Sequence, residues 1–139
     1  MYDELRHRGF LKKEAVSPAE VRAALARARR DLATAGDLLG KDDDWALAVA
    51  YNAVLQAGRA LMFSQGYRPS SVEGHKTVFV FLREALASEH TSLVTYFNRV
   101  RVKRHTAVYD VAGLVTQREA ADVLSRAARL VDIIEAELS

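Results

Sequence analysis

The sequence contains no cysteine, which excludes disulfide bonds and thiolate metal sites and gives no indication of secretion. Only two prolines and seven glycines occur in 139 residues, so long disordered linkers are not expected. The first ten residues, MYDELRHRGF, are charged throughout and lack the apolar segment of a signal peptide. No run approaches the roughly 20 apolar residues that a membrane span requires. We therefore expect a cytoplasmic protein that does not enter a membrane.

The length and composition are those of a single helical domain. A chain of 139 residues, 50% hydrophobic and 27% charged, is large enough to bury a core of its own. Alanine, leucine, arginine and glutamate are abundant, and these residues favour helix. The net charge of +2 is too small to indicate a partner, but basic residues concentrate in two segments, Arg22–Arg30 and Arg99–His105.

Helix-start and helix-end signals divide the sequence into five helical segments. Ser17 is suited to be an N-cap with Glu20 three residues later, and Gly40 is suited to be the C′ residue of the same helix. Thr116 and Glu119 have the spacing of a second capping box. Apolar residues recur at steps of three and four between these signals. We predict helices over residues 17–39, 43–65, 74–87, 92–109 and 116–138.

These segments predict an all-α, up-and-down bundle of four to five helices. Residues 1–16 are expected to form an N-terminal arm and residues 17–139 the bundle domain. No strand pattern or internal repeat is apparent, and the longest loop is expected at residues 67–74. The second helix is rich in alanine, so we expect it to be the central, buried one. Trp45 and Tyr51 on this helix should pack in the core or against a second subunit.

A cluster of basic residues near the end of the fourth helix is the most informative feature of the sequence. It lies between aromatic residues and places five basic side chains within seven positions: Arg99, Arg101, Lys103, Arg104 and His105. Positions four apart lie on one helix face, so one face should carry Arg101, His105 and Tyr109. The neighbouring stripe is apolar at Leu93, Phe97, Val100 and Val108 but contains Arg104. A guanidinium in that stripe requires a carboxylate, a carbonyl or a bound anion.

The cluster is chemically suited to a phosphodiester. Arginine presents a planar fork of donors that matches phosphate oxygens, and histidine exchanges protons near neutral pH. Metal-free RNA cleavage requires both properties, because a proton must leave the 2′-hydroxyl and charge develops on the phosphate. The alternative is an ordinary solvated face whose charges pair with nearby carboxylates.

Three segments together resemble the prokaryotic HEPN domains. They are RRDLATAGDLLGKDDDWALAVAYNAVLQAGRALMFSQGY, HKTVFVFL and RVRVKRHTAVYD, and the resemblance runs from about Arg29 to Leu138. It implies an all-α bundle that forms homodimers. Many HEPN domains are metal-independent endoribonucleases, and several are toxins paired with a small nucleotidyltransferase antitoxin. Their hallmark is an arginine followed by four to six residues and a histidine, with a polar residue after the arginine, and dimerisation places two copies of this motif in one cleft.

The motif can be aligned with this sequence in two ways. Arg99 and His105 have the required separation, but the residue after Arg99 is then an apolar valine. In the second alignment Arg104 and His105 match the arginine and its polar neighbour, and Tyr109 occupies the place of the histidine. We favour the second alignment because Arg104 lies in the mostly apolar stripe, which we expect to face the core or a partner subunit. It leaves catalysis open, because a tyrosine hydroxyl is a poor proton acceptor at neutral pH.

The resemblance implies a role for each residue of the site. Arg104 would hold the scissile phosphate, His105 would transfer protons, and Tyr109 would position or replace the acid. Tyr109 would also be the candidate for AMP transfer by the antitoxin. Substrate would be guided by further residues: Arg99, Arg101, Lys103 and His75. No cofactor is expected, and no histidine and carboxylate residues have the spacing of a metal site.

Two other functions remain open at this point. The same fold could be a non-catalytic module that holds RNA, a nucleotide or a nucleotidyltransferase partner in its cleft. It could also be a purely structural helical adaptor.

Overall fold

Five long helices account for most of the described part of the chain. The computed structural model describes residues 9, 11–13, 16–69, 74–110 and 112–139, so much of the predicted N-terminal arm lies outside the described residues. The elements in chain order are β1 (Leu11–Lys13), α2 (Pro18–Leu38), α3 (Asp43–Ser64), β2 (Tyr67–Pro69), α4 (Gly74–Ala85), η1 (Ser88–His90), α5 (Thr91–His105), η2 (Thr106–Asp110) and α6 (Gln117–Leu138). The predicted all-α bundle is confirmed.

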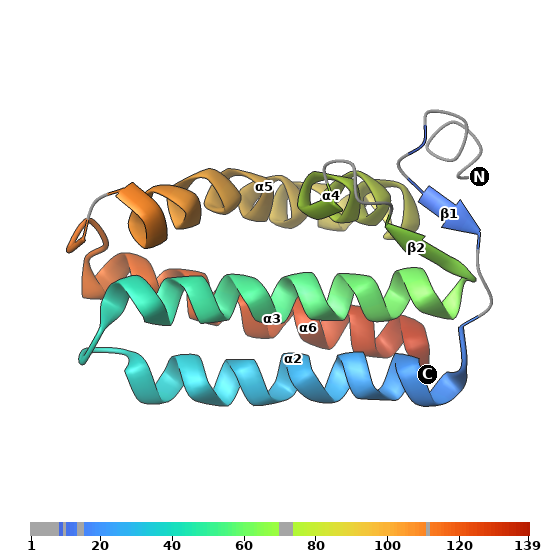
Figure 1. Ribbon diagram of the computed structural model, residues 1–139, viewed down its shortest axis with the longest axis horizontal. Helices are drawn as coiled ribbons and strands as arrows, with labels where there is room; N and C mark the ends of the chain where they lie inside the picture. The colour runs from blue at the N-terminus through green and yellow to red at the C-terminus, as the bar shows by residue number, and fades with distance from the viewer. Residues whose placement is uncertain (1–8, 10, 14–15, 70–73, 111) are drawn as a thin grey trace.

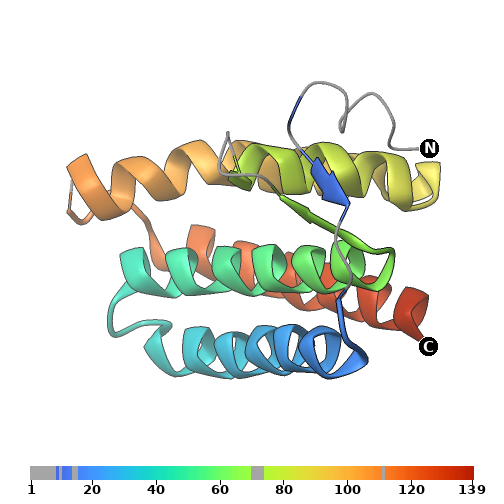
Figure 2. The same cartoon turned by 45° about the vertical axis from the view of Figure 1, so that its right-hand side comes forward.

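Helix α3 is the centre of the bundle. Figures 1 and 2 show α2 on one side of it and α4 with α5 on the opposite side, while α6 runs alongside it. Thirteen of its 22 residues are buried, and seven of these thirteen are alanine or glycine. Small side chains allow neighbouring helix backbones to approach closely, so one helix can contact all the others. This confirms the prediction that the second helix is central.

The predicted capping signals of α2 and α6 are confirmed. Ser17 and Glu20 form a complete capping box at the start of α2, and Thr116 and Glu119 form another at the start of α6. Gly40 follows the C-cap of α2 with a φ angle of 82°, a left-handed conformation that glycine adopts without strain. These local signals determine where α2 begins and ends and where α6 begins.

A short antiparallel pair of strands was not predicted from the sequence. Leu11 lies opposite Pro69, and Lys13 lies opposite Tyr67, so β2 occupies the start of the expected loop at 67–74. Each strand has only three residues, which is too short to show the two-residue alternation of a strand in sequence. Arg68 also forms an ion pair with Glu20 at 3.0 Å, which joins β2 to the start of α2.

The hydropathy of α3 reaches the range of membrane spans, contrary to the expectation from its sequence. Its mean hydropathy is 1.2 over an 18-residue window, and 72% of that window is buried inside the protein. The central helix of a soluble bundle has the same length and composition, because it is apolar on nearly every face.

The predicted fourth helix is α-helical only as far as His105. It continues as a single π turn, η2, in which backbone hydrogen bonds join residues five apart rather than four. Residues five apart therefore lie nearer to one face here than they would in an α-helix. The segment after η2 is attached to α3 by Asp44, whose carboxylate accepts hydrogen bonds from the backbone nitrogens of Gly113 (2.6 Å) and Val115 (3.1 Å).

The position of α4 depends on close contact with α3 at Gly58. A Cβ atom at Gly58 would lie 2.5 Å from Val78 Cγ1 and 3.2 Å from Leu82 Cδ1. Both side chains are buried in the core, so neither can move away freely. Gly36 in α2 is the opposite case, because a Cβ atom there would meet no other atom within 4 Å.

We predict that Gly58→Ala destabilises the protein by about 1–3 kcal/mol, because overpacking outweighs the gain in helix propensity. The matched variant Gly36→Ala should instead stabilise it by about 0.5–1 kcal/mol, because only the propensity changes. Urea unfolding followed by circular dichroism measures both values. Equal effects of the two substitutions would show that α4 is not in close contact with α3.

Candidate functional site

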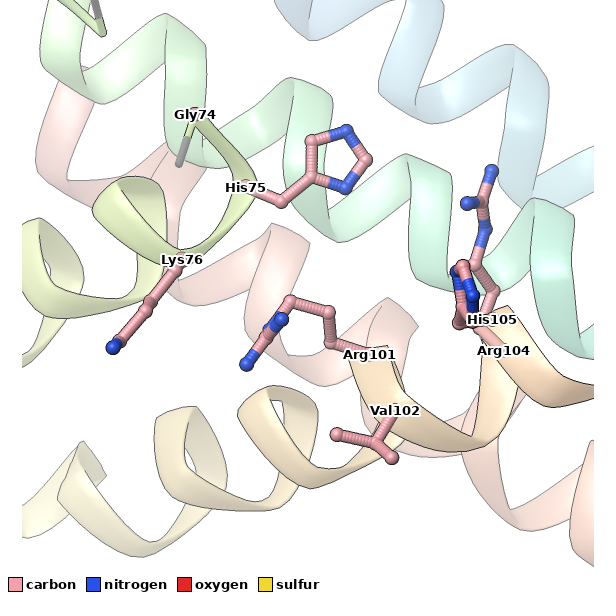
Figure 3. Close-up of a pocket in the computed structure, with 7 residues that line it drawn as sticks. All are labelled: Gly74, His75, Lys76, Arg101, Val102, Arg104 and His105. Atoms are coloured by element: carbon pink, nitrogen blue, oxygen red, sulfur yellow. The ribbon is translucent and has the colours of Figure 1, made fainter. Parts of the chain in front are cut away.

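A basic cavity lies between the start of α4 and the C-terminal half of α5. It has a volume of about 580 Å³ and is lined by Gly74, His75, Lys76, Arg101, Val102, Arg104 and His105 (Figure 3). Five of these seven residues are arginine, lysine or histidine, and none is aspartate or glutamate. The volume is in the range of small-ligand sites. The composition of the lining selects for an anion.

Arg104 extends from α5 toward α3 (Figure 3) and is half-buried. Its guanidinium carbon lies 5.6 Å from the centre of the Tyr51 ring and 6.0 Å from the centre of the Tyr109 ring. Its Nε atom is buried and has no hydrogen-bond partner among the described residues. The sequence required a counter-charge or an anion for this side chain, and within the described part of the chain no carboxylate pairs with it. Two aromatic faces therefore hold the guanidinium while leaving its donors for a ligand.

His75 and Tyr51 form a hydrogen-bonded pair beside the cavity. The Tyr51 hydroxyl lies 3.1 Å from His75 Nδ1, and the Tyr51 side chain is fully buried. Burial raises the pKa of Tyr51 to about 12, so the hydroxyl keeps its proton. The pKa of His75 is lowered from its ordinary value of 6.5, first by burial and then by the positive charges of nearby arginines. The imidazole is therefore neutral at neutral pH.

Three arginines surround this pair: Arg59 on α3, and Arg101 and Arg104 on α5. Burial lowers the pKa of Arg59. Arg101 Nε donates a hydrogen bond to Asn98 Oδ1 at 3.2 Å. None of the three forms an ion pair with a carboxylate of the described residues, which leaves a concentration of uncompensated positive charge.

The sequence cluster is divided between two faces of α5. Arg101, Arg104 and His105 line the basic cavity, whereas Arg99 and Lys103 line a second cavity of about 320 Å³ between α5 and α6. Lys103 forms an ion pair with Glu119 at 3.0 Å, and Asp122 also lines this second cavity. The structure thus separates Arg99 and Lys103 from the other predicted site residues, and Lys103 has the carboxylate partner expected of an ordinary helix surface.

Tyr109 lies at the edge of the basic cavity rather than inside it. Its side chain is 65% exposed, and its ring centre lies 5.0 Å from that of His105, which is also exposed. The π turn contributes to its proximity to Arg104, because it brings residues five apart nearer to one face than an α-helix does. The structure therefore brings Arg104, His105 and Tyr109 together, as the second motif alignment requires.

Sequence reasoning missed two contributors to the site. Arg59 was not singled out, and Tyr51 was expected only to pack, although it is both buried and bonded to His75. An available signal was the arginine itself, which is the one basic residue of a mostly apolar helix and lies eight residues after Tyr51. Trp45, expected in the core or against a second subunit, is 50% exposed and so does not lie in the core, and its packing against a second subunit stays a prediction. Among the described residues, no three His, Cys, Asp or Glu side chains are grouped so that they could hold a metal ion.

Comparisons with known proteins identify the family and the fold. The family model of the HEPN domain matches residues 21–137 of this chain. The crystal structure of TT1696 from Thermus thermophilus superposes with a TM-score of 0.66 at 21% identity, covering 84% of this chain and 96% of that one. At that identity the likeness is one of fold alone. No curated protein matches the chain in sequence.

We predict that His75 makes the stability of the protein depend on pH in buffers without polyvalent anions. The pKa of His75 in the folded state lies below the ordinary 6.5 of the unfolded chain. At a pH between these two pKa values, the unfolded chain binds a proton that the folded chain does not. The free energy of unfolding should therefore decrease as the pH falls below about 6.5, and His75→Gln should remove this component. Urea unfolding of both proteins between about pH 8 and pH 5.5 measures it. Identical pH profiles would contradict the neutral imidazole.

Proposed function

This chain belongs to the HEPN domain family, and from that premise we propose that it is a metal-independent endoribonuclease that binds RNA in the basic cavity between α4 and α5. The resemblance inferred from the sequence is confirmed by the family match. At the level of the family, HEPN domains are modules that act on or bind RNA and nucleotides, and they commonly dimerise. The reaction, the substrate and the partner of this chain are our proposals.

The single observation that carries the proposal is the basic lining of the cavity, to which the described residues contribute no carboxylate. Arginine side chains normally find carboxylates when they are half-buried, because an unpaired charge in such a place is costly. Arg101 and Arg104 have no such partner among the described residues, and Arg104 keeps an unpartnered donor. A phosphate group would satisfy these donors with the bidentate geometry that arginine favours.

The proposed reaction is an internal transfer at phosphorus. The 2′-oxygen of the ribose attacks the adjacent phosphate, the bond to the 5′-oxygen breaks, and a 2′,3′-cyclic phosphate forms. His105 accepts the proton of the 2′-hydroxyl, and Tyr109, adjacent to it, donates a proton to the departing 5′-oxygen. Arg104 holds the phosphate and stabilises the charge that develops on it, while Arg101 and His75 position the substrate.

A homodimer would complete this site. Val102 lines the cavity and is 60% exposed, and Tyr109 at the same edge is 65% exposed. Large apolar side chains at a cavity edge favour a covering partner. A second copy placed over this edge would bring two sets of Arg104 and His105 into one cleft. If the chain is the toxin of a toxin–antitoxin pair, the Tyr109 side chain, which is exposed in the single protomer, would be the target of a nucleotidyltransferase antitoxin.

We predict that the purified protein degrades RNA in the presence of EDTA and that Arg104→Ala lowers the rate by about 100-fold or more, as expected for loss of a transition-state donor. Arg129→Ala removes the same charge from an exposed position on α6 and should leave the rate near that of the wild type. Gel assays of a labelled RNA measure the rates, and circular dichroism checks the fold. A wild-type protein without activity, or an active Arg104→Ala variant, would contradict the proposal. A comparable loss in Arg99→Ala would favour the other motif alignment.

A second function is favoured by one observation, the tyrosine at position 109 where the family motif has histidine. A module without this histidine would bind RNA without cutting it. Binding would still weaken with salt, because phosphate contacts release counterions.

The substitution Tyr109→His distinguishes the two functions. If the chain only binds RNA, wild-type protein leaves RNA intact and Tyr109→His gains EDTA-resistant cleavage, because an imidazole then lies beside Arg104. If the wild type is the nuclease, we expect both proteins to cleave. The measurement is the same gel assay, with Tyr109→Phe as the control that removes only the hydroxyl. Failure of both the wild type and Tyr109→His to cut RNA would exclude a nuclease with this motif alignment.

A further inference from the structure

Within the described part of the chain, the titratable groups around His75 are all basic apart from one hydroxyl. From α3 it faces the Tyr51 hydroxyl and Arg59, and from α5 it faces Arg101 and Arg104. The remaining titratable groups that line the cavity are Lys76 and His105. No carboxylate of the described residues pairs with the three arginines or lines the cavity. An imidazole in this position cannot carry a proton without adding a further positive charge to several that are already uncompensated.

The hydrogen bond to Tyr51 defines which ring nitrogen is available to a ligand. Tyr51 is fully buried and its hydroxyl keeps its proton, so it requires an acceptor, and His75 Nδ1 lies 3.1 Å away. The neighbouring arginines offer only donors. With Tyr51 as donor to Nδ1, the imidazole proton is on Nε2. The ring is therefore held in one orientation and one tautomer by a buried partner.

An anion in the cavity would reverse the electrostatic balance. A phosphate beside Arg101 and Arg104 compensates their charges and places negative charge near the imidazole, and both changes favour the protonated ring. This consequence rests on the proposed binding of phosphate in the same cavity.

We propose that His75 is a proton-coupled anion ligand: binding of a phosphate group between α4 and α5 is accompanied by uptake of one proton from solvent onto the His75 imidazole. The resulting imidazolium donates one N–H to the phosphate and the other to the oxygen of Tyr51, whose own proton turns from Nδ1 to the bound phosphate, the acceptor that the ligand supplies. His75 is then a positioning residue: its imidazolium form, which holds the phosphate by a hydrogen bond, exists only while the phosphate is bound.

The proposal predicts in which direction the affinity for the anion changes with pH. Because the bound state holds one more proton than the free state, affinity for the anion increases as the pH falls. Between the pKa values of His75 in the free and bound states, the dissociation constant should change about tenfold per pH unit. A cavity that bound anions through arginine alone would show no such dependence.

Sulfate is the probe that tests this directly, because it stays doubly charged across the useful pH range whereas phosphate titrates within it. We expect sulfate to shift the ring nitrogens of His75 to the imidazolium pattern in NMR spectra, at a pH where the free protein holds a neutral ring. The dissociation constant of sulfate should increase about tenfold per pH unit in the coupled window. His75→Gln should make it independent of pH, and His105→Gln should retain the dependence.

The outcomes separate this inference from the proposed function. Sulfate binding with a pH-independent dissociation constant would overturn the proton coupling and leave the phosphate cavity in place. The same pH dependence in His75→Gln would assign the proton to another group and would also overturn it. If neither sulfate nor RNA perturbs the resonances of His75 and Arg104, the cavity is not an anion site and both proposals fail.

Discussion

The function proposed for this fold depends on a concentration of positive charge that the described chain does not compensate. Arg59, Arg101 and Arg104 surround the Tyr51–His75 pair, and within the described residues no carboxylate neutralises them. Elsewhere the same protein pairs its arginines in the ordinary way: Arg29 contacts Glu135 at 2.7 Å and Asp132 at 2.9 Å, and Arg126 contacts Asp122. Mutual repulsion of half-buried guanidinium groups opposes folding, so the rest of the bundle must offset it.

The scaffold supplies that stability through α3. Its small residues let α2, α4 and α6 approach closely, and Gly58 allows α4 to contact it directly. Asp44 fastens the chain after η2 to the start of α3, which holds the end of α5 in place. The basic side chains therefore project from helices whose positions are set by packing at a distance from the cavity. Rigid helices position a site more accurately than loops do.

The sequence predicted the scaffold better than the site. Capping boxes at Ser17 and Thr116 and the glycine at 40 are local signals, so the helix ends could be read directly. The π turn at 106–110 could not, because its residues also fit a continuing α-helix, and it is this turn that brings Tyr109 beside Arg104. The grouping of Arg59 with His75 is a tertiary contact between α3 and α4, which no local pattern encodes. Helical geometry by itself places Arg99 and Lys103 on another side of α5 from Arg101 and His105, but the ion pair that occupies Lys103 depends on where α6 lies.

The central claim, that the cavity holds uncompensated positive charge ready for a phosphate, is tested most directly by the effect of sulfate on stability. A ligand that binds only the folded state increases the free energy of unfolding as its concentration rises. Urea unfolding in sulfate, against chloride of matched ionic strength, should show extra stabilisation of the wild type and little of it in Arg104→Ala. Equal stabilisation of the two proteins, or none beyond that in chloride, would contradict the account.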